Sequence, residues 1–286
     1  MPAPRTLEQT SGNSWKIKRV KAISAVFPEI PEDCDIEEAL AKIEAFVRKE
    51  ASEIGVAINS NAFNNARGEW FEMLLAARFY NLSKKSGKFC LFTIPNVSAV
   101  EFTEFFDEDV RSRIRELKDH LSLQGIELQM SNPDFVCLDL RKIDRESAAA
   151  AFSQPAIKTF DETTAEFLDR LYQKFVGRCP FDGMKFVVSA KTSVRPDRRY
   201  QFVHEGNIIK ALTAHLQTRY WKIDFSTKYY ALTNTEPTGP DQAVLKTAAI
   251  SSITNVFAES VRAVDGISCI RKLSDIDDFF DRSTRK

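Results

Sequence analysis

Two apolar segments of this chain each carry a charged residue at one end. Asp134 follows Pro133 and precedes the apolar run F-V-C-L, while Lys191 closes a run that begins at Met184. Proline keeps the residue before it extended, so we expect Asp134 at a bend before a strand. Neighbouring strands would bring Asp134 and Lys191 to one edge of a sheet. An acid that holds a hard divalent cation and an amine that stabilises a charged phosphate suit metal-assisted hydrolysis of a phosphodiester.

This chemistry needs a second acid, which many nucleases carry two positions before the lysine. Here that position is Ser189. Glu205, fourteen positions after Lys191, can replace it. We expect Glu205 in the first turn of a helix whose apolar residues recur at helical spacing: Ile208, Ile209, Leu212 and Leu216. From there its carboxylate could reach the strand end that carries Lys191.

A further acid lies in apolar surroundings. The segment R-G-E-W-F-E-M-L-L-A-A (67–77) has the periodicity of a helix, with an expected buried side of Trp70, Met73, Leu74 and Ala77. Glu72 sits among apolar residues there. Acids on helices are usually solvated, but an acid in apolar surroundings needs a cation or a metal as its partner.

The segment between the Lys191 strand and the Glu205 helix is rich in arginine. We expect R-P-D-R-R (195–199) to form a polar turn. An arginine can bind guanine O6 and N7 with two hydrogen bonds, and an aspartate can accept one from the cytosine amino group. Arg195 and Arg198 with Asp197 between them could therefore read two adjacent G·C pairs, and a twofold dimer would read a C-C-G-G palindrome. The alternative is a surface salt-bridge cluster in which Asp197 only neutralises its neighbours.

The composition excludes several classes of protein. Lys and Arg number 40 and Asp and Glu 40, so a nonspecific nucleic-acid coat is excluded and any DNA contact must come from a local patch. The five cysteines are dispersed without a C-x-x-C pair, which indicates buried, reduced thiols rather than a zinc module. The N-terminus lacks the apolar segment of a signal peptide, and no stretch approaches membrane-spanning length. We therefore expect a soluble cytoplasmic protein.

Strands and helices alternate along the chain. The patterns predict helices at 36–54, 66–80, 107–121, 163–176 and 274–280, and strands at 88–94, 134–140, 184–191 and within 221–233. Residues 141–161 are expected to form a surface connection with a short helix, and residues 245–256 fit neither pattern. This order predicts an α/β fold with a mixed sheet. We expect a single domain over residues 1–286, with residues 1–34 as an irregular N-terminal arm.

Several blocks of the sequence carry a family resemblance. They are S-N-P-D (131–134), K-T-S-V-R-P-D-R-R (191–199), H-E-G-N-I-I-K-A-L (204–212) and A-H-L-Q-T-R-Y-W (214–221), with R-G-E-W-F-E (67–72), P-N-V (95–97) and A-V-D (263–265) in support. In order and spacing the chain resembles the tetrameric type IIF restriction endonucleases that cleave RCCGGY. These belong to the PD-(D/E)XK nuclease superfamily, in a branch whose second acid has moved from strand to helix. The resemblance implies a mixed five-stranded sheet flanked by helices.

The resemblance also implies a role for each candidate residue. Asp134 and Glu205 resemble the Mg²⁺ ligands, Lys191 the catalytic lysine and Glu72 an additional active-site acid. Ser189 stands where the vanished acid would be. The C-C-G-G core would be read by Arg195, Asp197 and Arg198.

Trp221 matches an aromatic residue that relatives bury between two dimers of a homotetramer. An ordinary core or strand-edge tryptophan is the alternative. The implied partners are double-stranded DNA with a CCGG core and, in the same system, a methyltransferase that protects the host genome. Cleavage is expected at R/CCGGY, with four-base 5′ overhangs.

Two other functions fit the same residues. One is a nuclease of the same superfamily that cuts without requiring CCGG. The other is a sequence-specific DNA-binding protein whose active site has decayed, although the set Glu72, Asp134, Lys191 and Glu205 argues against decay.

Overall fold

The structure is a computed structural model that describes residues 5–10, 15–244, 246–254 and 260–285. Its strands form a two-stranded sheet and a five-stranded sheet. The strands are β1 (Leu7–Gln9), β2 (Trp15–Ile17), β3 (Phe89–Thr93), β4 (Phe135–Asp139), β5 (Met184–Lys191), β6 (Lys228–Thr233) and β7 (Gly266–Cys269). The larger sheet has the order β3-β4-β5-β6-β7.

The larger sheet is mixed, as the sequence predicts. Strands β3, β4 and β5 are antiparallel neighbours, whereas β6 and β7 run parallel to β5. Because β4 and β5 are antiparallel, the beginning of β4 lies beside the end of β5. Asp134, just before β4, and Lys191, the last residue of β5, therefore meet at one edge of the sheet.

Ten α-helices surround the strands within the described residues. They are α1 (Arg19–Val26), α2 (Ile36–Glu53), α3 (Ser60–Ser86), α4 (Glu108–Ser122), α5 (Arg145–Ala151), α6 (Glu162–Arg170), α7 (Pro196–Tyr220), α8 (Gly239–Val244), α9 (Ile250–Thr254) and α10 (Leu273–Thr284). Short 3₁₀ segments are η1 (Phe102–Phe105), η2 (Leu140–Lys142), η3 (Leu171–Lys174) and η4 (Phe181–Gly183). None of the described helices has the length and apolar character needed to cross a bilayer.

Two helix layers cover the larger sheet. Side chains alternate between the faces of a strand, so Phe186 and Tyr230 point one way and Tyr229 the other. Phe186 and Tyr230 both pack against Phe279 of α10, next to α3. Tyr229 faces α7, where its hydroxyl meets Glu205. The α7 face is therefore the one on which Lys191 and Ser189 also lie.

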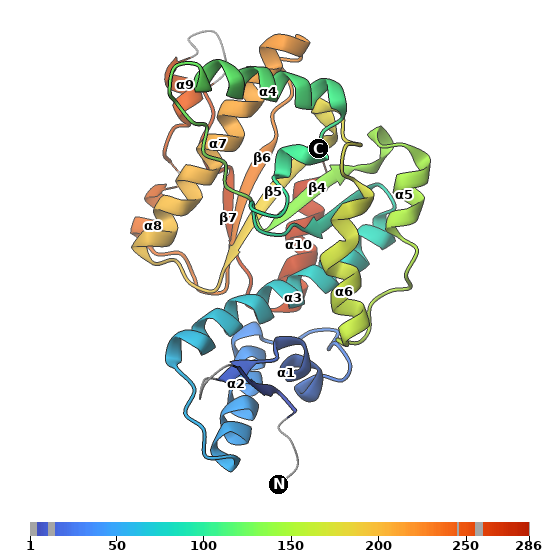
Figure 1. Ribbon diagram of the computed structural model, residues 1–286, viewed down its shortest axis with the longest axis vertical. Helices are drawn as coiled ribbons and strands as arrows, with labels where there is room; N and C mark the ends of the chain where they lie inside the picture. Colours follow the sequence, from blue (N-terminus) through green and yellow to red (C-terminus); the bar gives the residue numbers. More distant parts are fainter. Residues whose placement is uncertain (1–4, 11–14, 245, 255–259, 286) are drawn as a thin grey trace.

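Residues 5–10 and 15–34 form more regular structure than the sequence indicates. The interpretation as an irregular arm is wrong for these described residues, since they contain β1, β2 and α1. Leu7, Ile17 and Ile23 are buried because these elements pack on α2 and α3. The short apolar runs give no clear period, and their burial depends on contacts with distant helices. In Figure 1 the N-terminal elements lie at one end of the molecule and the larger sheet at the other, with α3 between them.

The arginine-rich segment is helical, contrary to the predicted turn. Arg195 is the N-cap of α7 and Pro196 its first residue. Proline at the first helical position loses no hydrogen bond, and an acid such as Asp197 is favourable in the first turn. Glu205 therefore lies roughly two and a half turns into α7, not in the first turn.

Most other predicted elements are present. Asp35 caps α2 by accepting a hydrogen bond from Glu38 N at 2.9 Å, and α3, α4, α6 and α10 cover the remaining predicted helices. Within 221–233 only β6 is a strand. Residues 250–254 of the ambiguous segment form α9, while Leu245 and residues 255–256 lie outside the described part of the chain.

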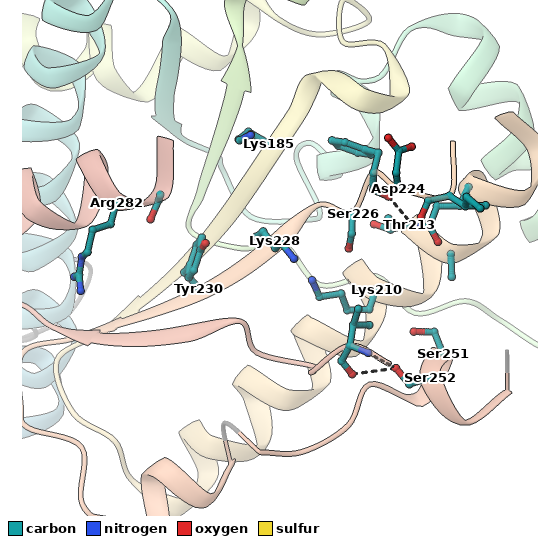
Figure 2. A pocket seen from close by; sticks show the side chains of 16 residues that line it. Lys185, Lys210, Thr213, Asp224, Ser226, Lys228, Tyr230, Ser251, Ser252 and Arg282 are labelled. Carbon is teal, nitrogen blue, oxygen red and sulfur yellow. Dashed lines mark hydrogen bonds between the residues drawn. The ribbon is translucent and has the colours of Figure 1, made fainter. Parts of the chain in front are cut away.

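The opposite end of β5 and β6 holds a second charged cluster. Lys210 Nζ lies 2.6 Å from Asp265 Oδ2 and donates to the carbonyl of Thr227 at 2.9 Å. Lys228 Nζ lies 3.5 Å from the other oxygen of Asp265. Figure 2 shows Lys210 and Lys228 pointing toward one another, beside a cavity of about 350 Å³ that both line. Lys210 thus ties α7 to the sheet at the end away from Lys191.

Candidate active site

Lys191 and Asp134 form an ion pair at the edge of the sheet. Lys191 Nζ donates to Asp134 Oδ2 at 2.8 Å, and the same oxygen accepts from Ala190 N at 2.6 Å. Burial alone would lower the pKa of Lys191, but Asp134, with weaker contributions from Glu72 and Glu205, raises it above its ordinary value. The amine is therefore a protonated, preorganised cation.

Glu205 comes to the same region from the middle of α7. Its Oε2 accepts from Ser189 Oγ at 2.5 Å and from the Tyr229 hydroxyl at 2.7 Å. Its Oε1 accepts from Gln201 Nε2 at 2.8 Å and from Ser131 Oγ at 3.3 Å. The residue is 2% exposed, and these hydrogen bonds satisfy both of its buried carboxylate oxygens.

Glu72 approaches from α3. Burial, and then the negative charge of Asp134, raise its pKa to about 8. On the same helix Glu69 forms an ion pair with Arg19. Glu72 lines two cavities of about 710 Å³ each, one shared with Asp134 and the other with Lys191. A cation bound between Glu72 and Asp134 would therefore stabilise the ionised form of Glu72.

The acids fit a divalent cation by charge and donor type. Carboxylate oxygens are the ligands that Mg²⁺ prefers, and the pKa of Glu72 is raised first by burial and then by the negative charge of Asp134. Both hydrogen bonds that the Asp134 carboxylate accepts from described residues reach Oδ2, which leaves Oδ1 free to bind a cation. The described residues nonetheless contain no group of three or more Asp, Glu, His or Cys close enough to hold a metal as they stand. Binding would therefore require the acids to move closer together.

The three candidate recognition residues lie at the beginning of α7, next to the acids. Arg195 Nη2 lies 3.4 Å and Arg198 Nε 3.8 Å from Asp197 Oδ2. These separations are long, and Arg195 and Asp197 are exposed, so the cluster contributes little to stability. Arg195 and Arg198 line the cavity that also contains Lys191 and Glu72. The two arginines thus border the same space as Lys191 and Glu72.

Trp221 lies on the surface. It is 87% exposed, ends α7 and adopts a left-handed backbone conformation with φ 54°. The alternative of a core tryptophan is therefore wrong. Ile223 beside it is also exposed, so this end of α7 presents apolar surface. Its burial in a tetramer stays a prediction.

By residue type alone, Arg199, His204 and Lys210 of α7 could contact phosphates or serve packing. Arg199 pairs with the buried Asp241, and Lys210 with Asp265, so both contribute to packing. His204 is exposed on α7.

The sequence did not indicate four neighbours of the acids, namely Arg19, Ser131, Gln201 and Tyr229. Gln201 lies four residues before Glu205 on α7, so the two side chains are neighbours on the helix surface. This contact would have been predicted if residues 196–204 had been recognised as helical. The others come from distant segments.

Comparisons with known proteins identify the family of this chain. The Cfr10I/Bse634I restriction endonuclease family matches residues 6–286. The type II restriction enzyme Cfr10I of Citrobacter freundii is 32% identical over 269 residues, which are 93% of this chain and 94% of that protein. The crystal structure of the type IIF restriction endonuclease Bse634I with cognate DNA superposes with a TM-score of 0.91 at 32% identity, over 99% of both chains. A second Bse634I structure gives 0.90 at 31% identity over the same shares. The chain belongs to the Cfr10I/Bse634I family of restriction endonucleases.

Proposed function

We propose that this protein is a type II restriction endonuclease that cleaves double-stranded DNA at R/CCGGY by Mg²⁺-dependent hydrolysis. The observation that carries the proposal is the ion pair of Lys191 with Asp134 at 2.8 Å, beside a cavity that Arg195 and Arg198 also line. Family membership and the likeness to a relative solved with its cognate DNA support it.

The acids and the lysine have distinct roles. Asp134 and Glu205 hold Mg²⁺, and Glu72 is the additional acid. Bound there, Mg²⁺ would act as a Lewis acid at the phosphate and lower the pKa of the attacking water. Lys191 donates to a nonbridging oxygen of the scissile phosphate and stabilises the negative charge that develops on it. Ser189 is not a ligand in this scheme. It donates to Glu205 at 2.5 Å and holds that carboxylate in position.

The products follow from an in-line attack. Water attacks phosphorus opposite the 3′ oxygen, the bond from phosphorus to that oxygen breaks, and the departing oxygen takes up a proton. The ends are therefore a 5′-phosphate and a 3′-hydroxyl. Cleavage after the outer purine on both strands leaves a four-base 5′ overhang.

Recognition of CCGG is assigned to the beginning of α7. Arg195 and Arg198 each bind one guanine through O6 and N7, and Asp197 accepts from the cytosine amino groups. The long contacts within the cluster support this role, because these groups are only loosely paired with one another. The reading requires two subunits related by a twofold axis.

The proposed assembly is a homotetramer, formed when two dimers bury Trp221 and its apolar surroundings. Residues 1–286 act as one catalytic domain in each subunit. The enzyme acts in the cytoplasm, where a methyltransferase of the same system protects the host DNA.

Digestion of phage DNA tests the proposal. The purified protein is incubated with the DNA with and without Mg²⁺, and the fragment ends are sequenced. Each fragment should have the sequence CCGGY at its 5′ end, and the base before the cut in the uncut DNA should be a purine. These ends should form only when Mg²⁺ is present. Cleavage of a plasmid without CCGG would indicate a less specific nuclease of the same superfamily. Tight binding to CCGG duplexes without cleavage would indicate a decayed active site.

A further inference from the structure

Glu205 lies on α7, and its carboxylate reaches the end of β5 at Ser189. Its direction there depends on the hydrogen bonds that its two oxygens accept. Its two carboxylate oxygens lie in different surroundings. The hydrogen bonds to Oε2, from Ser189 and Tyr229, are buried, whereas those to Oε1, from Gln201 and Ser131, are only partly buried. Oε2 is therefore the fixed oxygen and Oε1 the one whose partners can be exchanged.

Tyr229 is suited to hold the fixed oxygen. It is 0% exposed, and its hydroxyl lies 2.7 Å from Glu205 Oε2. The phenol hydroxyl donates this hydrogen bond, and the carboxylate oxygen accepts it. Tyr229 lines neither of the two cavities beside Glu72, so it does not reach a substrate there.

The backbone of Tyr229 is itself held in place. Tyr229 N donates to Asp265 Oδ2 at 2.7 Å, and Asp265 N donates to the carbonyl of Tyr229 at 2.8 Å. The same Asp265 pairs with Lys210 of α7. Helix α7 is therefore bonded to this part of the sheet at two points, through Glu205 and through Lys210.

Gly206 makes the approach of α7 possible. A Cβ atom at this position would lie 2.1 Å from the carbonyl oxygen of Ala263 and 3.3 Å from Cδ1 of Tyr229. The first distance is far too short for any nonbonded contact, and the obstacle is backbone. A side chain at Gly206 would push α7 away from β6 and lengthen the bond from Tyr229 to Glu205.

We propose that Tyr229 is the positioning residue for Glu205, and that Gly206 is the residue that permits the contact. The proposal rests on the proposed role of Glu205 as a metal ligand. Tyr229 and Ser189 fix Oε2, which sets the direction of Oε1 toward the cation. Hydrogen bonds of this kind to a ligand carboxylate typically change metal affinity 10–100-fold.

The test uses Tyr229→Phe in the full chain, which removes one hydroxyl and keeps the ring. Calorimetric titration with Ca²⁺ in the presence of a CCGG duplex should show metal affinity at least about tenfold weaker. The Mg²⁺ concentration for half-maximal cleavage should rise by a similar factor, with the KM for DNA unchanged. Circular dichroism confirms that the variant is folded.

Tyr230→Phe is the matched control. Tyr230 is the next residue on β6 but faces α10, where it packs against Phe279. The same chemical change there should leave Ca²⁺ affinity and the Mg²⁺ requirement unchanged. Equal shifts in both variants would overturn the proposal, since the effect would then be general to β6.

Glu205→Gln separates this proposal from the proposed function. If Glu205→Gln abolishes Ca²⁺ binding while Tyr229→Phe leaves it unchanged, only the positioning role is overturned. If Glu205→Gln also leaves Ca²⁺ binding unchanged, the ligand role itself is wrong. Gly206→Ala should weaken Ca²⁺ binding as Tyr229→Phe does, and wild-type affinity and stability in Gly206→Ala would contradict the close approach.

Discussion

Two lysines at opposite ends of the same strands differ in a way that separates the proposed active site from a structural contact. Lys191 and Lys210 are both largely buried, and each lies close to one aspartate, at 2.8 Å from Asp134 and 2.6 Å from Asp265. Their pKa values nevertheless move in opposite directions. The pKa of Lys191 is raised and that of Lys210 is lowered.

The balance of surrounding charge explains the difference. Burial lowers the pKa of both amines. Lys191 is compensated by three carboxylates, those of Asp134, Glu72 and Glu205. Among the described residues, Lys210 is compensated by Asp265, which it shares with the cation Lys228. The Lys191 end thus has more acids than lysines, which suits a divalent cation, while at the Lys210 end two lysines share one aspartate.

The largest effect is expected from Lys191→Ala. Loss of a preorganised donor to the transition state costs about a hundredfold to a thousandfold in kcat, and the lysine also balances the acids. Cleavage of a CCGG plasmid should fall by about a thousandfold or more, whereas binding to a CCGG duplex in Ca²⁺ should persist in a gel-shift assay. Substantial remaining cleavage would remove Lys191 from the chemistry.

Lys210→Met should instead affect stability. Removal of Lys210 leaves the largely buried Asp265 with the more distant Lys228, so the cost is up to about 3–5 kcal/mol. Urea unfolding should show a loss of this order, while the fraction that stays folded cleaves at the normal rate. Unchanged stability, or a loss of kcat in the folded protein, would remove the distinction between the two lysines.

Glu72 gives the Lys191 end a pH dependence. Its pKa is raised from 4.5 to about 8 in the folded protein, so the folded state keeps a proton that the unfolded state loses. The contribution of Glu72 to the free energy of unfolding of the metal-free protein should therefore be largest below pH 4.5. It should decrease as the pH rises to about 8. Each pKa unit contributes about 1.4 kcal/mol, so the total is on the order of a few kcal/mol.

Glu72→Gln checks that pH dependence. The amide does not titrate, so the variant should lose less stability than the parent between pH 5 and pH 8, roughly the window in which Glu72 titrates. Thermal unfolding in EDTA measures both proteins. Parallel stability curves would show that another group is responsible.

The arginines at the beginning of α7 should control sequence choice. Arg195→Ala or Arg198→Ala should cost about 1–3 kcal/mol of discrimination at one base pair. The ratio of kcat/KM for CCGG and for single-mismatch duplexes measures it. An equal loss on every duplex would indicate phosphate contacts.

Trp221→Ala should have the smallest effect on the chain itself, because an exposed side chain contributes little to folding. Sedimentation should detect dimers in place of tetramers, with unfolding in urea altered by less than about 0.5 kcal/mol. A persistent tetramer would place the interface elsewhere.

The sequence predicted the sheet edge better than it predicted the helix. Apolar runs ending at Asp134 and Lys191 define strands by local pattern, and antiparallel pairing brings the two together. The start of α7 was missed because R-P-D-R-R is typical both of a polar loop and of the beginning of a helix, where proline and aspartate are common. Tyr229 and Asp265 could not be inferred, since their partners on α7 depend on the packing of distant segments. For the same reason, sequence alone did not distinguish Lys210 from a phosphate-binding lysine.

The central claim is that Asp134 and Glu205 share one divalent cation beside Lys191. Crystals of the protein with a CCGG duplex and Mn²⁺ test it directly by anomalous diffraction. The account predicts an anomalous peak within bonding distance of a carboxylate oxygen of both Asp134 and Glu205. A peak that contacts neither acid, or only one of them, would contradict it.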